Sequence, residues 1–194
     1  MVAIATLSLL VLLLLATLLY GSDIWSAFRN SLSTSGTILE AGEYKLARMI
    51  TPFALFASVG LAPSLAILLH GGCALLSLLT LVWVALKGWQ LRHIIVLAIL
   101  TGTTLSPYAY DYDLCVLAPA LALAYQAIKT ELTVILRAVL AASLLLATGY
   151  GLTTALFAGA LGDAGFGLPA LAGLGLILTI GITFHAIRRF EANA

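Results

Sequence analysis

The chain has 194 residues, of which 62% are hydrophobic and only 9% charged, and its formal net charge is +1. A mean hydropathy of +1.14 excludes a soluble globular protein, and the lack of any basic block gives no support for nucleic acid as a partner. An α-helix rises about 1.5 Å per residue and a hydrocarbon core is roughly 30 Å thick, so each span needs about 20 apolar residues. The sequence therefore predicts an all-α, polytopic membrane protein with about six transmembrane helices.

The N-terminal part is predicted to hold one span and a long external loop. Residues 2–20 are nearly pure Leu, Val, Ala and Thr, which predicts a lipid-facing helix. Residues 22–60 follow as the loop, where Trp25 and Phe28 at a spacing of three predict an aromatic anchor at the water interface. Residues 38–49 mix charged and apolar side chains at helical spacing, which predicts a helix lying on the membrane surface.

Five further spans are predicted. The apolar run 94–105 is so short that it covers only about 18 Å, and its outer end is expected below the membrane surface. The fifth span is expected to break near Gly149 and Gly151. The expected ranges are a short interfacial or re-entrant helix at 53–59, followed by spans at 64–86, 94–105, 108–128, 132–161 and 168–187.

Lys and Arg are shared unevenly between the two predicted sides. One side carries Lys87, Arg92, Lys129, Arg137, Arg188 and Arg189, and the other carries Arg29, Lys45 and Arg48. By the positive-inside rule the richer side is cytoplasmic, which predicts an inner-membrane protein with a cytoplasmic C-terminus and an external long loop.

Polar and aromatic residues concentrate in one stretch, 106–113, between two apolar runs. Pro107 suits the first turn of a helix and Ser106 can cap it, so the span 108–128 is predicted to begin here. On a regular helix Asp111 and Asp113 lie about 200° apart and cannot face each other as a pair. One is expected to face a substrate pocket while the other caps the helix or pairs with a cation. The alternative is that both only complement the helix dipole.

The three predicted external cations are the candidates for binding an anionic, lipid-linked substrate. Arg in particular can bind a phosphate with two parallel, charge-assisted hydrogen bonds. The alternative is that Arg29, Lys45 and Arg48 are interfacial residues paired with Glu40 and Glu43.

No metal site is indicated by the cysteines. Cys73 and Cys115 lie inside apolar runs, far from the spacing of a metal site or a disulfide framework.

A rival interpretation is a non-catalytic multi-pass transporter or assembly subunit, in which the acids and His70 would line a solute path. A transporter is expected to show inverted repeats with polar groups at the midplane. The sequence has no visible repeat, and its acids cluster toward one surface.

Two segments resemble a known family. The first reads Leu39-Glu40-Ala41-Gly42, then Arg48-Met49 with Thr51, Phe53, Ala54 and Gly60, and the second reads Ser106-Pro107-Tyr108-Ala109-Tyr110-Asp111-Tyr112-Asp113-Leu114. The first resembles the outer-face segment of glycosyltransferase family 87, and the second resembles that family's Ser/Thr-Pro-Tyr…Tyr-Asp-Leu motif. Both keep the family's order and a similar separation.

The resemblance implies a GT-C type fold and the transfer of mannose, or a related hexose or pentose, from a polyprenyl-phosphate donor to a lipid or glycan acceptor. It implies no cofactor, and a divalent metal is compatible with it but not indicated. Membrane lipids, the donor and the acceptor are the implied partners. The residues implied in binding sugar or acceptor are Tyr108, Asp111, Tyr112 and Asp113, and those implied in binding the donor phosphate are Arg48 and Lys45.

The chain also departs from the family. Members often carry an Arg where Ala57 stands and an aromatic residue near Leu46. They are about twice as long, and their catalytic base is an Asp or Glu in a first external loop near the N-terminus. The chain therefore resembles a C-terminal half, with the other half as an expected partner, and Glu40 is only a weak candidate for the base if the chain is complete.

Overall fold

The computed structural model describes residues 2–41, 44–157 and 168–193. In these ranges the chain is helical, and its extended backbone pairs only in one isolated antiparallel bridge between Met49 and Tyr110. The all-α fold class predicted from the sequence is therefore confirmed. The chain divides into two compact units, Met1–Tyr44 and Lys45–Ala194, which are described separately.

The first unit consists of two helices, α1 (Val2–Tyr20) and α2 (Asp23–Glu40). Their axes differ by 104°, and Gly21 with φ +78° makes the corner between them. A helix over 38–49 was expected, and this prediction is wrong, because the helix ends at Glu40 and Lys45 and Met49 have non-helical backbone angles. Only Leu46–Arg48 form a short 3₁₀ turn, η1, and Met49 is extended because it pairs with Tyr110.

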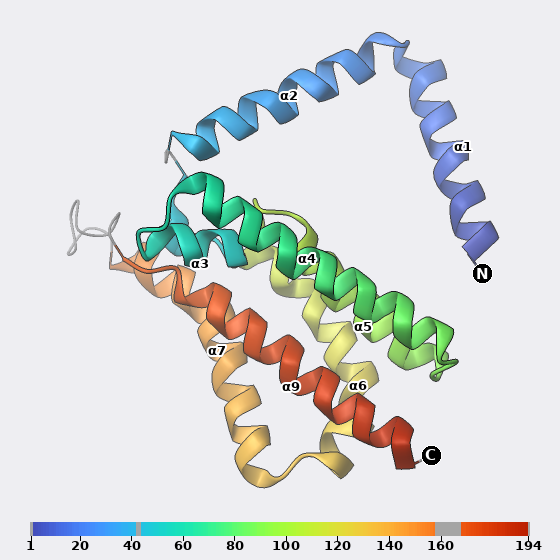
Figure 1. Cartoon of the computed structure of the whole chain (residues 1–194), viewed down its shortest axis with the longest axis vertical. Coiled ribbons are helices and arrows are strands. Elements are labelled where there is room, and N and C mark those ends of the chain that lie inside the picture. The colour runs from blue at the N-terminus through green and yellow to red at the C-terminus, as the bar shows by residue number, and fades with distance from the viewer. Residues whose placement is uncertain (1, 42–43, 158–167, 194) are drawn as a thin grey trace. The chain divides into compact units, whose positions relative to one another are not determined.

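The second unit is a bundle of five longer helices with a short helix at one end (Figure 1). The short helix α3 matches the predicted interfacial segment to within a residue at each end, and Thr51 caps it by accepting a hydrogen bond from Ala54 N. The helices are α3 (Pro52–Ser58), α4 (Pro63–Leu86), α5 (Leu91–Leu105), α6 (Leu117–Glu131), α7 (Val134–Leu156) and α9 (Leu171–Asn193).

Helices α7 and α9 pack closely because small residues line their contact. A Cβ added at Gly175 would lie 2.7 Å from both Ala147 N and Ser143 O, so only glycine fits there. Beside it, the hydroxyls of Ser143 and Thr179 lie 2.9 Å apart and satisfy each other in a buried position. The predicted break of the span near Gly149 and Gly151 is wrong, since α7 runs unbroken from Val134 to Leu156.

We expect Gly175→Ala to lower the free energy of unfolding by about 1–3 kcal/mol, because the new methyl group meets backbone atoms that cannot rotate away. Unfolding in mixed micelles of increasing SDS content would measure this change. Gly181→Ala is the matched control, since a Cβ at that position of the same helix meets nothing within 4 Å. Equal stability of the two variants would contradict the close approach of α7 and α9.

Three helices are long and apolar enough to cross a membrane, namely α4, α7 and α9, or four spans exist if the bent pair α1 and α2 counts as one. The chain is therefore a membrane protein, but the six predicted spans are not shown in the described residues. The main reason is that α5 and α6 have only 15 residues each, which is about 22 Å of helix against a core of roughly 30 Å.

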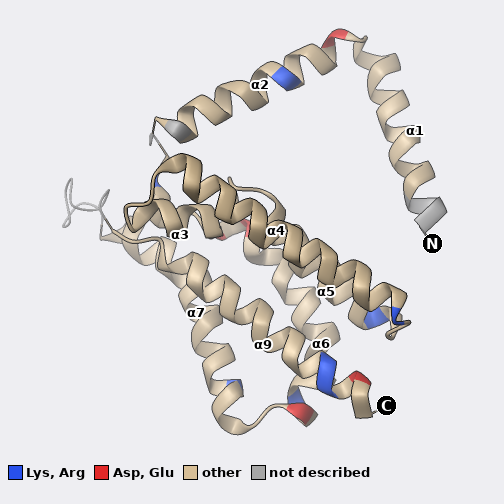
Figure 2. Ribbon diagram, viewed as in Figure 1, with Lys and Arg blue, Asp and Glu red and all other residues tan. Residues whose placement is uncertain are grey.

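The six cations predicted on one side lie at one end of the second unit. They fall at the C-terminal ends of α4, α6 and α9 and at the N-terminal ends of α5 and α7 (Figure 2). At this end the Glu191 carboxylate accepts a hydrogen bond from Gln90 N and contacts the buried ring of His93, which joins α9 to the start of α5. Since α5 runs from this end to Leu105, the stretch 106–113 lies at the opposite end of the bundle.

Candidate functional site

In the second unit, residues 49–51, which belong to the first resembling segment, lie beside residues 107–110 of the second. Ile50 N donates to Ala109 O at 3.1 Å, and Thr51 Oγ1 donates to Pro107 O at 3.1 Å. Met49 and Tyr110 form an antiparallel bridge next to the hydrogen bond between Ile50 and Ala109. Residues 49–51 are almost fully buried, so the contact belongs to the core of this end of the bundle.

The central stretch does not start a helix at Pro107 as predicted. The backbone is extended at Ser106 and Tyr110, a 3₁₀ helix η2 covers Asp111–Val116, and α6 begins only at Leu117. The predicted helical start is wrong because Pro107 and Ala109 use their carbonyl groups to bind the segment 49–51 instead of an α-helical turn. Ser106 still caps locally, since its hydroxyl accepts a hydrogen bond from Tyr108 N at 3.1 Å.

Asp111 forms an ion pair with Arg48 across the contact. Arg48 Nη2 lies 3.1 Å from Asp111 Oδ1 and 3.4 Å from Oδ2, and Oδ1 also accepts a hydrogen bond from Tyr112 N at 3.0 Å. The Asp111 side chain is 11% exposed and that of Arg48 is 40% exposed, so one partner is buried and the other reaches the surface. The buried Nε of Arg48 has no hydrogen-bond acceptor among the described residues.

The ion pair rests on a glycine of α7 that the sequence analysis did not identify as part of the site. A Cβ added at Gly151 would lie 2.6 Å from Asp111 Oδ2 and 3.4 Å from Arg48 Cα. Gly151 is therefore the position that makes room for the pair. Its local pattern, with Gly149 two residues earlier, indicated only a helix break, and the signal for its role lies in the tertiary contact.

Asp113 has a different environment from Asp111. Its Oδ2 accepts a hydrogen bond from Tyr110 N at 2.8 Å, which closes the first turn of η2. Asp113 also lines a cavity of about 670 Å³, which Asp111 does not line. The expectation that one acid pairs with a cation while the other faces a pocket thus describes the observed arrangement, although the helix on which it was based is absent.

The cavity combines a polar edge with an apolar wall. The polar edge consists of Thr103, Ser106, Tyr108 and Asp113. The remaining wall comes from α5, the end of η2 and the start of α6, with Ile99, Val116 and Pro119 as its larger side chains. The cavity therefore lies where the short helix α5 ends. An apolar wall with a few polar groups on one side suits an amphiphilic molecule with a polyol or sugar head.

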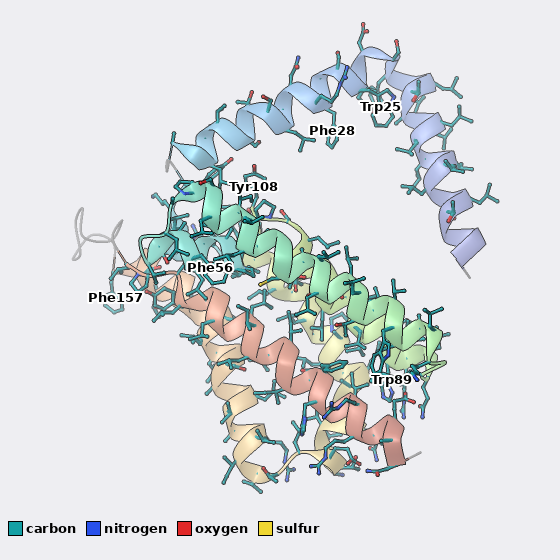
Figure 3. The ribbon with its side chains drawn as sticks, in the orientation of Figure 1. Trp25, Phe28, Phe56, Trp89, Tyr108 and Phe157 are labelled. Carbon is teal, nitrogen blue, oxygen red and sulfur yellow. The ribbon has the colours of Figure 1, made fainter. Side chains whose placement is uncertain are left out.

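Tyr108 lines the polar edge of the cavity, and Tyr110 and Tyr112 follow it in the chain without lining the cavity. Tyr110 and Tyr112 stack with centroids 5.7 Å apart and planes inclined by 8°, and Tyr112 is 67% exposed. Tyr108 is half-buried at the cavity (Figure 3). An exposed tyrosine face beside carboxylates and hydroxyls is suited to packing on a sugar ring while the polar groups bind its hydroxyls.

The other predicted site residues are placed as follows. Lys45 is exposed and directly precedes η1, so it is near Arg48 in the chain. Glu40 ends α2 in the first unit, and its side chain lies outside the described part of the structure. In the described residues no group of three or more His, Cys, Asp or Glu is placed to hold a metal ion. His70 is buried in α4 and does not line the cavity next to Asp113.

The site defined by this geometry is a cavity beside an ion pair at one end of a membrane-protein helix bundle. In comparisons with known proteins, no family model, no curated protein and no solved structure matches the chain.

Proposed function

We propose that the chain is a portion of a membrane glycosyltransferase that transfers a hexose or pentose, most simply mannose, from a polyprenyl-phosphate donor to a lipid or glycan acceptor. The proposal is supported by one observation above the others. Two segments 63 residues apart, each resembling glycosyltransferase family 87, meet through the hydrogen-bonded pair of Arg48 and Asp111 beside a cavity lined by Asp113 and Tyr108.

The proposed chemistry is an inverting displacement at the anomeric carbon of the donor sugar. An acceptor hydroxyl oxygen forms the new bond to this carbon, the bond from the carbon to the phosphate oxygen breaks, and polyprenyl phosphate leaves with the electron pair. The hydroxyl proton passes to a carboxylate base, for which Glu40 is the weak candidate in this chain and an N-terminal half, as the family resemblance implies, is the other source. No covalent intermediate with the protein is required.

The proposed roles follow from charge and placement. Arg48 binds the phosphate of the donor, with Lys45 as a second cation near it in sequence, because guanidinium groups form the strongest hydrogen bonds to phosphate oxygens. Asp111 holds the guanidinium in place through the 3.1 Å contact. Asp113 and Tyr108 contact sugar or acceptor at the polar edge of the cavity, and Tyr112, whose exposed ring does not line the cavity, is a further contact to the same molecule.

The proposed location is the cell (inner) membrane, with the site on the external face. The six cations at the opposite end of the bundle support this orientation, because Lys and Arg are enriched on the cytoplasmic side. The C-terminus would then be cytoplasmic, since α9 ends among these cations.

Membranes containing the full-length gene product, incubated with radiolabelled polyprenyl-phosphate sugars, test the proposal. We expect Asp113→Asn to lower transfer about 10-fold or more, since a hydrogen bond to a charged group contributes about 1.5–3 kcal/mol. The Asn oxygen can still accept the hydrogen bond from Tyr110 N, so the turn is kept. Asp23→Asn, an exposed acid of the first unit, is the matched control. Full activity of Asp113→Asn, or no sugar transfer by the wild type with any donor, would contradict the proposal.

A further inference from the structure

Helix α2 has one narrow apolar face. At about 100° per residue, Ile24, Trp25, Phe28, Leu32 and Leu39 fall within an arc of about 100° around the helix. Asp23, Ser26, Asn30, Ser33 and Thr37 fall in the opposite arc. Phe28 is 56% exposed and Leu32 is 51% exposed, whereas Leu39 at the C-terminal end of the face is buried and Ser35 is a polar residue within the arc. The uncovered apolar part of the face is therefore its stretch from Trp25 to Leu32.

Helix α1 differs from α2 in being apolar on every side. Residues 9–12 are Leu, Leu, Val and Leu, all exposed, and four consecutive residues face all sides of a helix. Such a helix is stable only among acyl chains. Helix α2 is a poor continuation of the span, because nine of its 18 residues are Asp, Arg, Asn, Ser or Thr, and the break at Gly21 turns the chain sharply.

The corner between α1 and α2 has a defined geometry. The axes differ by 104°, and the indole Nε1 of Trp25 donates to Thr17 Oγ1 of α1 at 2.9 Å, which joins the two helices across Gly21. If α1 stands upright in a bilayer, a bend of this size lays α2 close to the membrane plane. Trp25 and Phe28 both project to the inner side of the bend (Figure 3). The inner side is the side on which the bilayer around α1 lies.

We propose that α2 is a membrane-surface helix that inserts its Trp25–Phe28–Leu32 face into the outer part of the acyl-chain layer of the bilayer. The occupant of this face is lipid, because α1 fixes the position of the bilayer and the bend turns the apolar face of α2 toward it. Trp at the polar–apolar boundary agrees with the preference of indole for this depth. The charge of Arg29 is balanced by that of Asp23, and the helix has no basic cluster. Burial of apolar side chains, and not attraction to anionic lipid, therefore stabilises its position.

Fluorescence of a label at single cysteines tests this proposal. The full chain is prepared with Cys73→Ser and Cys115→Ser, and either Phe28→Cys or Leu32→Cys is labelled with the environment-sensitive dye NBD. Asn30→Cys, on the opposite face of the same helix, is the matched control. Each protein is reconstituted in phosphatidylcholine vesicles with or without phosphatidylcholine that carries a doxyl quencher at acyl carbon 5 or 12.

We expect the label at positions 28 and 32 to emit at shorter wavelength, by about 10–20 nm, than the label at position 30, as an apolar surrounding requires. The 5-doxyl lipid should quench these two sites more strongly than the 12-doxyl lipid, and the addition of anionic phosphatidylglycerol should not change the result. Water-like emission at all three sites would overturn the proposal. Blue-shifted emission without quenching by either lipid would indicate a protein partner. Quenching that is strongest with the 12-doxyl lipid on both faces would indicate a spanning helix. Both outcomes also overturn the proposal.

Discussion

Arg48→Ala is expected to reduce sugar transfer by about 100-fold and to raise the donor concentration needed for half-maximal rate. The physical reason is the loss of a charge-assisted contact to the donor phosphate, which contributes about 1.5–3 kcal/mol. The protein should remain folded, because the Arg48 side chain is 40% exposed and an ion pair with one exposed partner adds only about 1 kcal/mol or less. Initial rates at varied concentrations of labelled polyprenyl-phosphate sugar would measure both changes.

Three further variants separate binding of phosphate from a purely structural ion pair. Lys87→Ala removes an exposed cation at the other end of the bundle and should leave transfer unchanged. Arg48→Lys keeps the charge without the planar guanidinium, so an intermediate rate is expected. The double variant Arg48→Ala/Asp111→Ala removes both charges together. Recovery of wild-type transfer in this double variant would show that the pair only stabilises the fold, and the proposed role of Arg48 would be wrong.

The long apolar elements could be predicted from the sequence because each depends mainly on its own residues. Helix α4 begins one residue before the predicted start and ends at the predicted residue, and α3 follows from Pro52 and the capping hydroxyl of Thr51. The 20-residue requirement of a bilayer and the capping preferences of helices are local rules. Local rules were sufficient where no distant segment competed for the same backbone groups.

The central stretch was predicted wrongly because a distant segment does compete there. Ser106 and Pro107 form a sound helix-start signal, yet the carbonyl groups of Pro107 and Ala109 accept hydrogen bonds from Thr51 and Ile50. A sequence pattern cannot show this pairing, since the partners are more than 50 residues apart. The candidate residues could be selected from their chemistry, because few acids and cations occur in the chain, whereas the pairing of Arg48 with Asp111 was not predicted.

The wrongly predicted surface helix at 38–49 illustrates a second reason for error. The mixed pattern of 38–49 indicated an amphipathic helix, but the more regular pattern lies one segment earlier, where Trp25, Phe28 and Leu32 share one face. The prediction for 38–49 depended on its charged residues, although a surface helix depends on the spacing of its apolar residues. The aromatic pair at 25 and 28, predicted to be an anchor at the water interface, belongs to this more regular pattern.

Gly151→Ala is expected to lower transfer about 10-fold while changing the free energy of unfolding by less than about 1 kcal/mol. Its methyl group would stand 2.6 Å from Asp111 Oδ2, and a carboxylate at the end of a side chain can rotate away at little cost. The Arg48 Cα, 3.4 Å from the same point, already allows ordinary contact. The variant should therefore displace the Asp111 carboxylate from Arg48 without unpacking α7. This differs from Gly175→Ala, where the methyl group meets fixed backbone atoms.

Gly149→Ala is the control for Gly151→Ala, since a Cβ there meets nothing within 4 Å and the two variants share the gain in helix propensity of about 1 kcal/mol. A double-mutant cycle with Asp111→Ala decides the cause of the lost activity. If Gly151 acts only by making room for the carboxylate, adding Gly151→Ala to Asp111→Ala should cause no further loss of transfer. Additive losses of transfer would mean that Gly151 affects transfer through α7 itself. The small size of Gly151 would then not be needed to make room for the ion pair of Asp111 and Arg48.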